Sequence, residues 1–301
     1  MTGAASRVVL VTGGGRGLGR SHSLALAAAG NSVVVNDIGA ALDGRGPLDA
    51  SVARDVVDEI RRSGGEAVAD HSDVATHDGA AAAVARTLEE YGGLDAVVHS
   101  AGILRDRTFA KLDPADFDAV IRVHLGSPAY VTHAAWSALS ESGAGRVVLT
   151  SSAGGLFGQF GQSNYGAAKA ALVGLLNVLR LEGARAGIAV NAIAPVATTR
   201  MTAPLLPAEV LSGLGPEHVS DLVAHLCSAG CEHSGLMLEV GAGLAARVQV
   251  MTSDVRAVPL DGADATMARL LDELVSLTDL RGFDDSPTAL ERLLDRARNS
   301  N

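Results

Sequence analysis

Three side chains near the middle of the chain have the types and the spacing for acid–base chemistry at an oxygen atom. Tyr165 and Lys169 stand four residues apart, so on an α-helix they share one face. An ammonium group beside a phenol stabilises the phenolate, which lowers the tyrosine pKa toward neutrality and makes it a usable acid and base. Ser152 ends an apolar run, and its hydroxyl can hold a carbonyl or alcohol oxygen. A surface Tyr–Lys pair and a turn serine are the alternative, which the glycine-rich loop upstream makes less favourable.

That loop reads Thr-Gly-Gly-Gly-Arg-Gly-Leu-Gly over residues 12–19 and follows a short apolar run. Its key glycines fall as Gly13-x-x-x-Gly17-x-Gly19 and lead into an apolar segment of helical length. Glycines there permit a tight turn, let the backbone approach a pyrophosphate, and place that charge at a helix N-terminus. A bare strand-to-helix turn is the alternative. We expect a dinucleotide phosphate site.

An acidic residue follows the second apolar run, 18 residues after Gly19. This residue, Asp37, can accept hydrogen bonds from an adenosine ribose and would repel a 2′-phosphate, which favours NAD over NADP. Arg16 in the glycine loop has the opposite tendency, because a cation there can pair with a phosphate. A solvated acid at a strand end is the alternative for Asp37. We give Asp37 the greater weight because it meets the ribose itself.

The elements that must position these residues alternate between short apolar runs and longer alanine-rich segments. Continuous apolar runs fit strands that are covered on both faces, so the order predicts an α/β fold with a doubly wound parallel sheet, Rossmann-like. The predicted strands are Arg7–Val11, Ser32–Asn36, Glu66–Ala69, Leu94–His99, Arg146–Thr150, Ile188–Ile193 and Leu236–Val240. The predicted helices are Leu18–Ala29, Ala50–Ser63, Asp78–Tyr91, Pro114–Leu139 and Asn164–Ala186. An unusually long loop, Ile38–Asp49, follows the second strand.

The last part of the chain differs from the rest. Residues 1–246 contain no Pro/Ser-rich linker and read as a single Rossmann-type α/β domain. Residues 247–301 read as a C-terminal helical extension, because Ala263–Leu277 and Pro287–Arg298 carry leucines at helical spacing amid charges. We expect this extension to pack on the body or on a partner subunit, and the protein to be a homodimer or homotetramer.

Composition narrows the class of protein. The 301 residues carry a formal charge of −10, and 48% are hydrophobic while 19% are charged. This composition can bury a sizeable core and excludes an intrinsically disordered chain. The acidic balance, without a run of lysine or arginine, argues against nucleic-acid binding. No stretch is apolar and long enough to span a bilayer, and the N-terminal residues leave no room for a signal peptide. We expect a cytoplasmic protein whose partners are small molecules.

The two cysteines indicate a reducing environment and no metal. Cys227 and Cys231 lie too close together on a predicted helix to close a large loop by a disulfide. With His225 and His233 they suggest zinc, but the helical context and the ordinary burial of cysteines make a metal site improbable.

Taken together, the motifs identify the chain as a member of the short-chain dehydrogenase/reductase superfamily. The shared marks are Thr12-Gly13-x-x-x-Gly17-x-Gly19, Asp73-Val74, His99-Ser100-Ala101-Gly102, Ser152, Tyr165-x-x-x-Lys169 and Asn191-x-Ile193-x-Pro195. Within it, the chain is most similar to the (3R)-hydroxyacyl-CoA dehydrogenase part of type 2 peroxisomal multifunctional enzymes, also described as 17β-hydroxysteroid dehydrogenase type 4. The stretches that carry this similarity include Asn36-Asp37-Ile38-Gly39, Ile103-Leu104-Arg105-Asp106-Arg107 and Gly161-Gln162-Ser163-Asn164-Tyr165.

The resemblance implies a role for each site residue. Tyr165 would take the hydroxyl proton as hydride leaves for NAD, Lys169 would hold the nicotinamide ribose, and Ser152 would orient the oxygen. The other residues implied to bind NAD are Gly13, Arg16, Gly17, Leu18 and Gly19 at the pyrophosphate, Asp37 at the ribose, Asp73 and Val74 at the adenine, and His99, Ala101, Gly102, Val196, Thr198 and Thr199 toward the nicotinamide.

Three departures from the superfamily pattern bear on these roles. His99-Ser100 replaces the usual Asn-Asn, which changes one hydrogen bond on the cofactor side. His124 stands where a catalytic Asn is usual, although the multifunctional branch also has His there, and it either relays protons or fills a helix core. Val196 replaces the Gly that usually follows the Pro.

The leading hypothesis is therefore an NAD-dependent dehydrogenase that oxidises or reduces a secondary alcohol or ketone, with a (3R)-3-hydroxyacyl-CoA as its substrate. A steroid or other ketone dehydrogenase/reductase uses the same residues and is the first alternative. A non-catalytic nucleotide-binding partner subunit is the second, and the altered His99-Ser100 pair keeps it open. Two apolar segments, Leu156–Phe160 and Met201–Leu206, are candidate lids that suit an acyl or steroid-like substrate.

Overall fold

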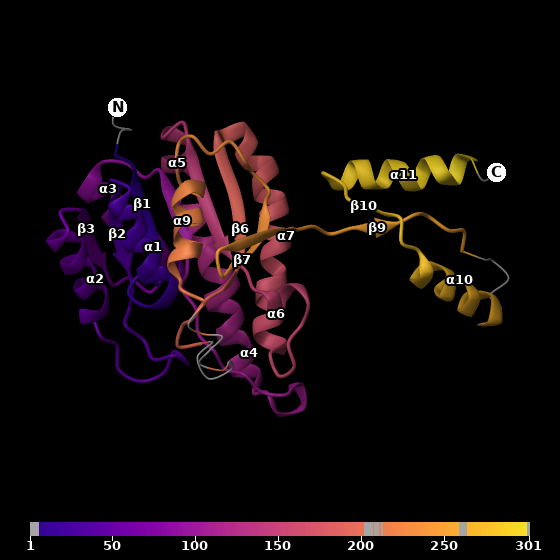
Figure 1. Ribbon diagram of the computed structural model, residues 1–301, viewed down its shortest axis with the longest axis horizontal. Coiled ribbons are helices and arrows are strands. Elements are labelled where there is room, and N and C mark those ends of the chain that lie inside the picture. Colours follow the sequence, from indigo (N-terminus) through magenta and orange to yellow (C-terminus); the bar gives the residue numbers. More distant parts are fainter. Residues whose placement is uncertain (1–5, 202–206, 208–210, 212, 259–263, 300–301) are drawn as a thin grey trace. The chain divides into compact units, whose positions relative to one another are not determined.

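The computed structural model describes residues 6–201, 207, 211, 213–258 and 264–299 (Figure 1). An eight-stranded sheet, in the order β3-β2-β1-β4-β5-β6-β7-β8, forms its centre, and every pairing from β3 to β7 is parallel. The strands are β1 Val8–Thr12, β2 Ser32–Asn36, β3 Glu66–Asp70, β4 Ala96–His99, β5 Gly145–Thr150, β6 Ile188–Val196, β7 Met237–Gly241 and β8 Leu244–Val248. The predicted doubly wound α/β fold is confirmed, and the seven predicted strands agree to within three residues at either end.

β8 is a strand that the sequence analysis did not predict. It follows β7 after Ala242 and Gly243, which both have positive φ angles, 51° and 72°. Two consecutive residues with positive φ form the tight turn that joins antiparallel strands, so β7 and β8 make a hairpin at the sheet edge.

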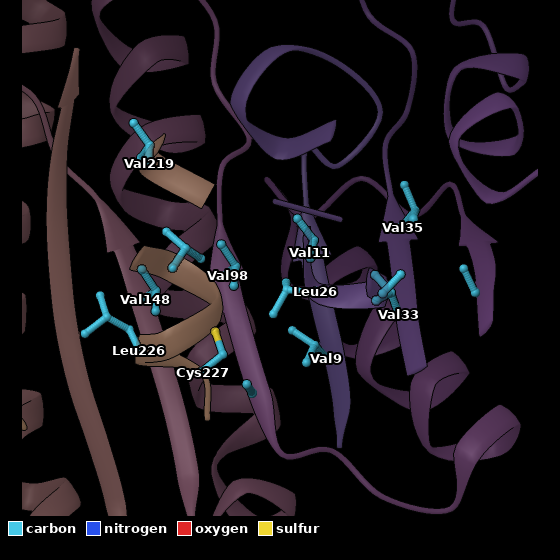
Figure 2. Close-up of a cluster of buried hydrophobic side chains, with 14 of the residues drawn as sticks. Val9, Val11, Leu26, Val33, Val35, Val98, Val148, Val219, Leu226 and Cys227 are labelled. Carbon is cyan, nitrogen blue, oxygen red and sulfur yellow. The ribbon is translucent and has the colours of Figure 1, made fainter. Parts of the chain in front are cut away.

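Helices cover both faces of the sheet because the apolar strands need burial on both sides. Helices α1, α2 and α9 pack on one face and α3, α5 and α7 on the other (Figure 1). The main helices are α1 Gly17–Ala28, α2 Ser51–Arg62, α3 His77–Tyr91, α4 Pro114–Ile121, α5 Ser127–Glu141, α7 Ser163–Ala186 and α9 Glu217–Leu226, with short helices η1 Phe109–Lys111 and α6 Ala153–Leu156. Figure 2 shows the first core, where strand valines such as Val11, Val33 and Val148 meet Leu26 of α1 and Leu226 of α9.

The single helix predicted over Pro114–Leu139 is wrong, because it is interrupted between α4 and α5. A π-helical turn, η2 Arg122–Gly126, lies between them. Pro128 has no N–H for the carbonyl of His124, four residues earlier, and the N–H of Ser127 instead donates to the carbonyl of Arg122. His124 therefore lies within an irregular turn rather than a regular helix.

The two cysteines are free and buried, but they do not lie within a helix as predicted. α9 ends at Leu226, and Cys227 is its C-cap. The buried guanidinium of Arg146 donates to the carbonyls of Ser228 (3.1 Å) and Ala229 (2.9 Å) and so turns this segment out of the helical path.

The chain forms two compact units, Met1–Arg247 and Val248–Asn301. In the second unit, the two predicted helices are present as α10 Asp264–Ser276 and α11 Ser286–Asn299, each within one residue of the expected bounds. Strand β9 Thr252–Ser253, before α10, pairs antiparallel with strand β10 Leu280–Arg281, which lies between α10 and α11 in the chain. Docking of this extension on the body or on a partner subunit stays a prediction.

Neither a membrane-spanning helix nor a cluster of metal ligands is present among residues 6–201, 207, 211, 213–258 and 264–299. None of the helices in these ranges is long and apolar enough to cross a membrane. Within the same ranges, three or more His, Cys, Asp or Glu side chains do not gather as metal ligands would.

Candidate active site

One cavity of about 510 Å³ lies where β1, β2, β4, β5 and β6 end. Open α/β sheets bind ligands at this edge. The predicted site residues that line it are Gly13, Arg16, Gly17, Leu18, Gly19, Asp37, Asp73, Val74, Ala101, Gly102, His124, Ser152, Tyr165, Lys169 and Thr199. Three predicted cofactor residues, His99, Val196 and Thr198, are not among its lining residues.

The glycine loop has the geometry that a pyrophosphate requires. Gly13 and Gly17 adopt positive φ angles of 63° and 52°. A Cβ on Gly13 would lie 2.6 Å from the backbone nitrogen of Ala101, and a Cβ on Gly19 would lie 2.1 Å from the carbonyl oxygen of Gly13. The N-cap of α1, Arg16, makes no capping bond with its side chain, so the first helical N–H groups have no side-chain cap beside the cavity. This loop fits the phosphates of a dinucleotide.

We expect Gly19→Ala to weaken cofactor binding strongly and to destabilise the fold. The added methyl overlaps a backbone oxygen that cannot move alone, so the loop must shift, at a cost of about 1–3 kcal/mol in unfolding free energy. The dissociation constant of NADH, measured by its fluorescence, should rise at least about tenfold. Gly174→Ala in α7 is the control, because a Cβ there meets nothing within 4 Å and should leave both quantities unchanged or slightly improve stability. Equal NADH affinity in wild type and Gly19→Ala would contradict this role for the loop.

Asp37 follows β2 and is fixed by the backbone on both sides. One carboxylate oxygen accepts the N–H of Gly15 (3.0 Å) and the other accepts the N–H of Gly39 (2.7 Å). Each oxygen keeps lone pairs that can receive a ribose hydroxyl. Arg16 donates through Nη1 to the carbonyl oxygen of Ala40 (2.9 Å), so part of its guanidinium is already engaged by the chain.

The structure brings Ser152, Tyr165 and Lys169 to the same end of the cavity. Ser152 caps α6, accepting the N–H of Gly154 at 3.2 Å. Tyr165 and Lys169 lie on α7, and Lys169 Nζ is 5.7 Å from the centroid of the tyrosine ring. The ammonium group also donates to the carbonyl oxygen of Thr150 at the end of β5.

The pKa of Tyr165 moves opposite to the expectation. Burial raises it, the hydrogen bond with Ser152 opposes that rise, and the negative charge of Asp106 adds to it. Burial also lowers the pKa of Lys169 to about 7. The predicted lowering of the tyrosine pKa is therefore wrong for the protein alone, because burial disfavours the charged phenolate more than the hydrogen bond with Ser152 favours it.

Two histidines have different surroundings. His124 lines the cavity, its Nε2 lies 3.0 Å from the nitrogen and 2.7 Å from the oxygen of Ile103, and its ring meets Tyr165 edge-on at 5.0 Å. Burial holds the pKa of His124 well below its usual value, so it is neutral. His99 points away from the cavity toward α5, where its Nε2 lies 2.9 Å from the hydroxyl of Thr132.

The segment after β6 is held by its own backbone contacts. Thr198 donates its hydroxyl to the carbonyl of Leu211 (2.6 Å) and its N–H to that of Leu214 (2.7 Å). Thr199 instead faces the glycine loop, where its methyl carbon would lie 3.6 Å from a Cβ on Gly17.

Sequence reasoning missed the residues that hold the start of α7. Asn164, fully buried, donates to the carbonyl of Arg105 (2.9 Å) and accepts the N–H of Tyr165 (2.8 Å). Gln162 donates to the carboxylate of Asp106 (2.7 Å). These bonds fix the first turn of the helix that carries Tyr165. The two segments that these bonds join, 103–107 and 161–165, both belong to the family resemblance, but their positions in the chain do not indicate that they are in contact.

Comparison with known proteins places the chain in a family. The family model described as short chain dehydrogenase matches residues 7–209. A short-chain type dehydrogenase/reductase of Mycobacterium tuberculosis is 50% identical over 84% of this chain and 88% of its own length. A hydroxyacyl-CoA dehydrogenase of the same organism is 41% identical over 78% of this chain and 77% of its length. Peroxisomal multifunctional enzyme type 2 of Mus musculus is 47% identical over 79% of this chain, but the match spans only 32% of that enzyme.

Solved structures agree with this placement. A short chain dehydrogenase from Mycobacterium avium has a TM-score of 0.78 and 42% identity, over 90% of this chain and 95% of that one. A 7α-hydroxysteroid dehydrogenase, solved with NADH and 7-oxo glycochenodeoxycholic acid, has a TM-score of 0.71 and 26% identity, over 79% and 93%. The chain belongs to the short-chain dehydrogenase family and is an oxidoreductase that acts on CH–OH groups with a nicotinamide cofactor.

Proposed function

We propose that the protein interconverts a secondary alcohol and a ketone with NAD, and that its substrate is a (3R)-3-hydroxyacyl-CoA. The observation that carries the chemistry is that Ser152, Tyr165 and Lys169 share one cavity with the glycine loop and Asp37. The substrate class is supported by the similarity to a hydroxyacyl-CoA dehydrogenase and to the peroxisomal multifunctional enzyme.

In this proposal Tyr165 exchanges the proton of the substrate oxygen. As the phenolate it takes the proton from the alcohol during oxidation, and as the phenol it gives that proton to the ketone oxygen during reduction. Ser152 hydrogen-bonds the same oxygen and also the phenol, so it aligns donor and acceptor and stabilises charge on either. Asn164 accepts the backbone N–H of Tyr165, and His124 contacts the tyrosine ring edge-on, so both hold the phenol in place.

Lys169 makes this proton exchange possible near neutral pH. NAD, when bound along the glycine loop, supplies the hydride acceptor, and its positive ring adds a charge beside the phenol. With a pKa of about 7 in the protein alone, Lys169 gains its proton readily when ribose hydroxyls or a phenolate approach. Its bond to the carbonyl of Thr150 fixes the direction of the ammonium group.

The preference for NAD over NADP rests on Asp37. A 2′-phosphate would face a carboxylate that two backbone N–H groups hold in place, so it could not swing away. Arg16, the cation that could favour NADP, has one N–H committed to Ala40. Like-charge repulsion therefore outweighs the attraction of the arginine.

The two segments predicted as lids for an acyl or steroid-like substrate differ in what the structure describes of them. The segment 156–160 carries Phe157 and Phe160, whose side chains are 68% and 88% exposed, so apolar surface is available to a substrate. In the other lid candidate, Met201–Leu206, only Met201 is described, and it lines the cavity. Residues 202–206 lie outside the described ranges.

The proposal is tested by the absorbance of reduced nicotinamide with purified protein, NAD or NADP, and paired (3R)- and (3S)-hydroxyacyl-CoA and hydroxysteroids. We expect turnover of the (3R)-acyl-CoA with NAD. Turnover of a steroid alone would replace the substrate class, and preference for NADP would overturn the cofactor assignment. Silence across the panel with NADH binding intact would favour a non-catalytic partner subunit.

A further inference from the structure

The long loop after β2, residues 38–49, is a closed structure. A Cβ on Gly39 would lie 2.0 Å from the carbonyl oxygen of Asp49, so the two ends of the loop touch. Gly39 has a φ angle of 71°, which lets the chain turn back on itself there. A surface loop of this length with adjoining ends is an Ω-loop. We call it the strap.

The strap crosses the cofactor cavity. In the sheet β1 lies between β2 and β4, and the strap leaves β2 yet contacts the segment that follows β4. The N–H of Leu104 donates to the carbonyl of Leu42 (2.9 Å), and a Cβ on Gly44 would lie 3.0 Å from the side chain of Ile103. It therefore passes over the end of β1, where the glycine loop lies. Strap residues that line the cavity are Ile38, Ala40, Ala41, Leu42 and Gly44.

Two sets of polar contacts fasten the strap. On the near side it is held by the bond from Arg16 to Ala40. On the far side Arg105 donates Nε to the carbonyl of Asp43 (2.8 Å) and Nη1 to the carboxylate of Asp116 (3.0 Å). Arg45, from the strap itself, reaches the same carboxylate oxygen at 2.6 Å. One carboxylate on α4 thus forms ion pairs with both arginines.

Asp116 is placed to make this fastening strong. Its side chain is 17% exposed and that of Arg105 is 15% exposed, so water and salt screen their attraction less than at the surface. Asp116 does not line the cavity. Its partner Arg105 does line the cavity, so Asp116 can act on a ligand through Arg105 and through the strap that Arg105 holds.

We propose that Asp116 is a positioning residue that keeps the strap closed over the bound dinucleotide and thereby slows its release. The identity of the ligand rests on the proposed function. To leave the cavity across the strap, the dinucleotide must wait for Leu104 to separate from Leu42 and for the arginines to leave Asp116. The ion pairs therefore set a barrier to dissociation rather than a contact with the ligand.

The test measures how fast NADH and NADPH leave the full-length protein after mixing with excess oxidised cofactor, by loss of their fluorescence. We expect Asp116→Asn to accelerate release about tenfold, because both arginines then face a neutral amide oxygen instead of a negatively charged carboxylate. Arg45→Met, which removes only the exposed partner, should give a smaller acceleration. Asp118→Asn is the matched control, an exposed carboxylate on the same helix for which the described residues offer no hydrogen-bond partner.

Two further readouts separate positioning from general damage. Hydrogen exchange at the amide of Leu104 should accelerate in Asp116→Asn and not in Asp118→Asn, because that N–H bonds the strap. Raising salt should speed release from the wild type and have little effect on Asp116→Asn.

The outcomes distinguish the two proposals. Unchanged release from a folded Asp116→Asn protein overturns the strap. Binding of NADPH but not NADH overturns the NAD preference alone, since release of NADPH then tests the strap equally. A wild type that binds neither overturns both.

Discussion

Tyr165→Phe should abolish turnover while leaving cofactor binding intact. The change removes one hydroxyl and keeps the ring that packs edge-on against His124 at 5.0 Å. Because we propose that this hydroxyl exchanges the substrate proton, kcat should fall by about 10²–10⁴, the usual contribution of general acid–base catalysis. The dissociation constant of NADH should stay within about twofold, since Tyr165 contributes little to holding the phosphates and the adenosine.

Turnover is measured with the substrate that the absorbance panel identifies, and NADH binding by fluorescence. The matched control is Tyr91→Phe at the end of α3, where the buried hydroxyl has no hydrogen-bond partner among the described residues and burial raises its pKa to about 12. That variant should keep full activity. Wild-type turnover in Tyr165→Phe would remove this residue from the mechanism, and loss of both turnover and NADH binding would point to a collapsed site.

The sheet could be predicted because its strands are covered on both faces. Every residue of Ser32–Asn36 is buried. Its three consecutive valines do not match an amphipathic helix, in which apolar residues recur every three or four positions, but they match a strand that is covered on both faces. The glycine loop and the Tyr-x-x-x-Lys spacing are equally local signals. A parallel sheet then brings its strand ends to one edge, which is why most of the predicted site residues line one cavity.

What the sequence could not indicate depends on contacts between distant segments. His99 belongs to a motif that reads as cofactor-binding, yet its ring meets Thr132, 33 residues later. The pKa of Tyr165 is raised by burial, lowered by the hydrogen bond with Ser152 and raised by the charge of Asp106. The spacing of residues in the sequence reveals none of these three effects. The attachment of Asn164 to Arg105 likewise joins residues 59 positions apart. Such pairings follow from packing rather than from pattern.

Asp37→Ser should reverse much of the preference between NAD and NADP. The variant lacks the carboxylate that we propose binds the ribose, so kcat/KM with NAD should fall about 10–100-fold, as expected for the loss of hydrogen bonds to a charged group. It also removes the negative charge that repels a 2′-phosphate. Arg16 and Asp37 both lie close enough to Arg200 to influence its pKa, the first lowering it and the second raising it, so the variant leaves two cations near that position. We therefore expect kcat/KM with NADP to rise about tenfold.

Initial rates with both cofactors, measured on wild type and variant, give the ratio directly. Because Asp37 also accepts the N–H groups of Gly15 and Gly39, a small loss of stability is expected and is followed by urea unfolding. Asp58→Ser on α2 is the control, since it removes the same charge from an exposed position and should leave the ratio unchanged. If the ratio of the two kcat/KM values is the same in Asp37→Ser as in the wild type, Asp37 does not select the cofactor. In that case the selection would lie with Arg16 and Arg200, the two cations that line the cavity near Asp37.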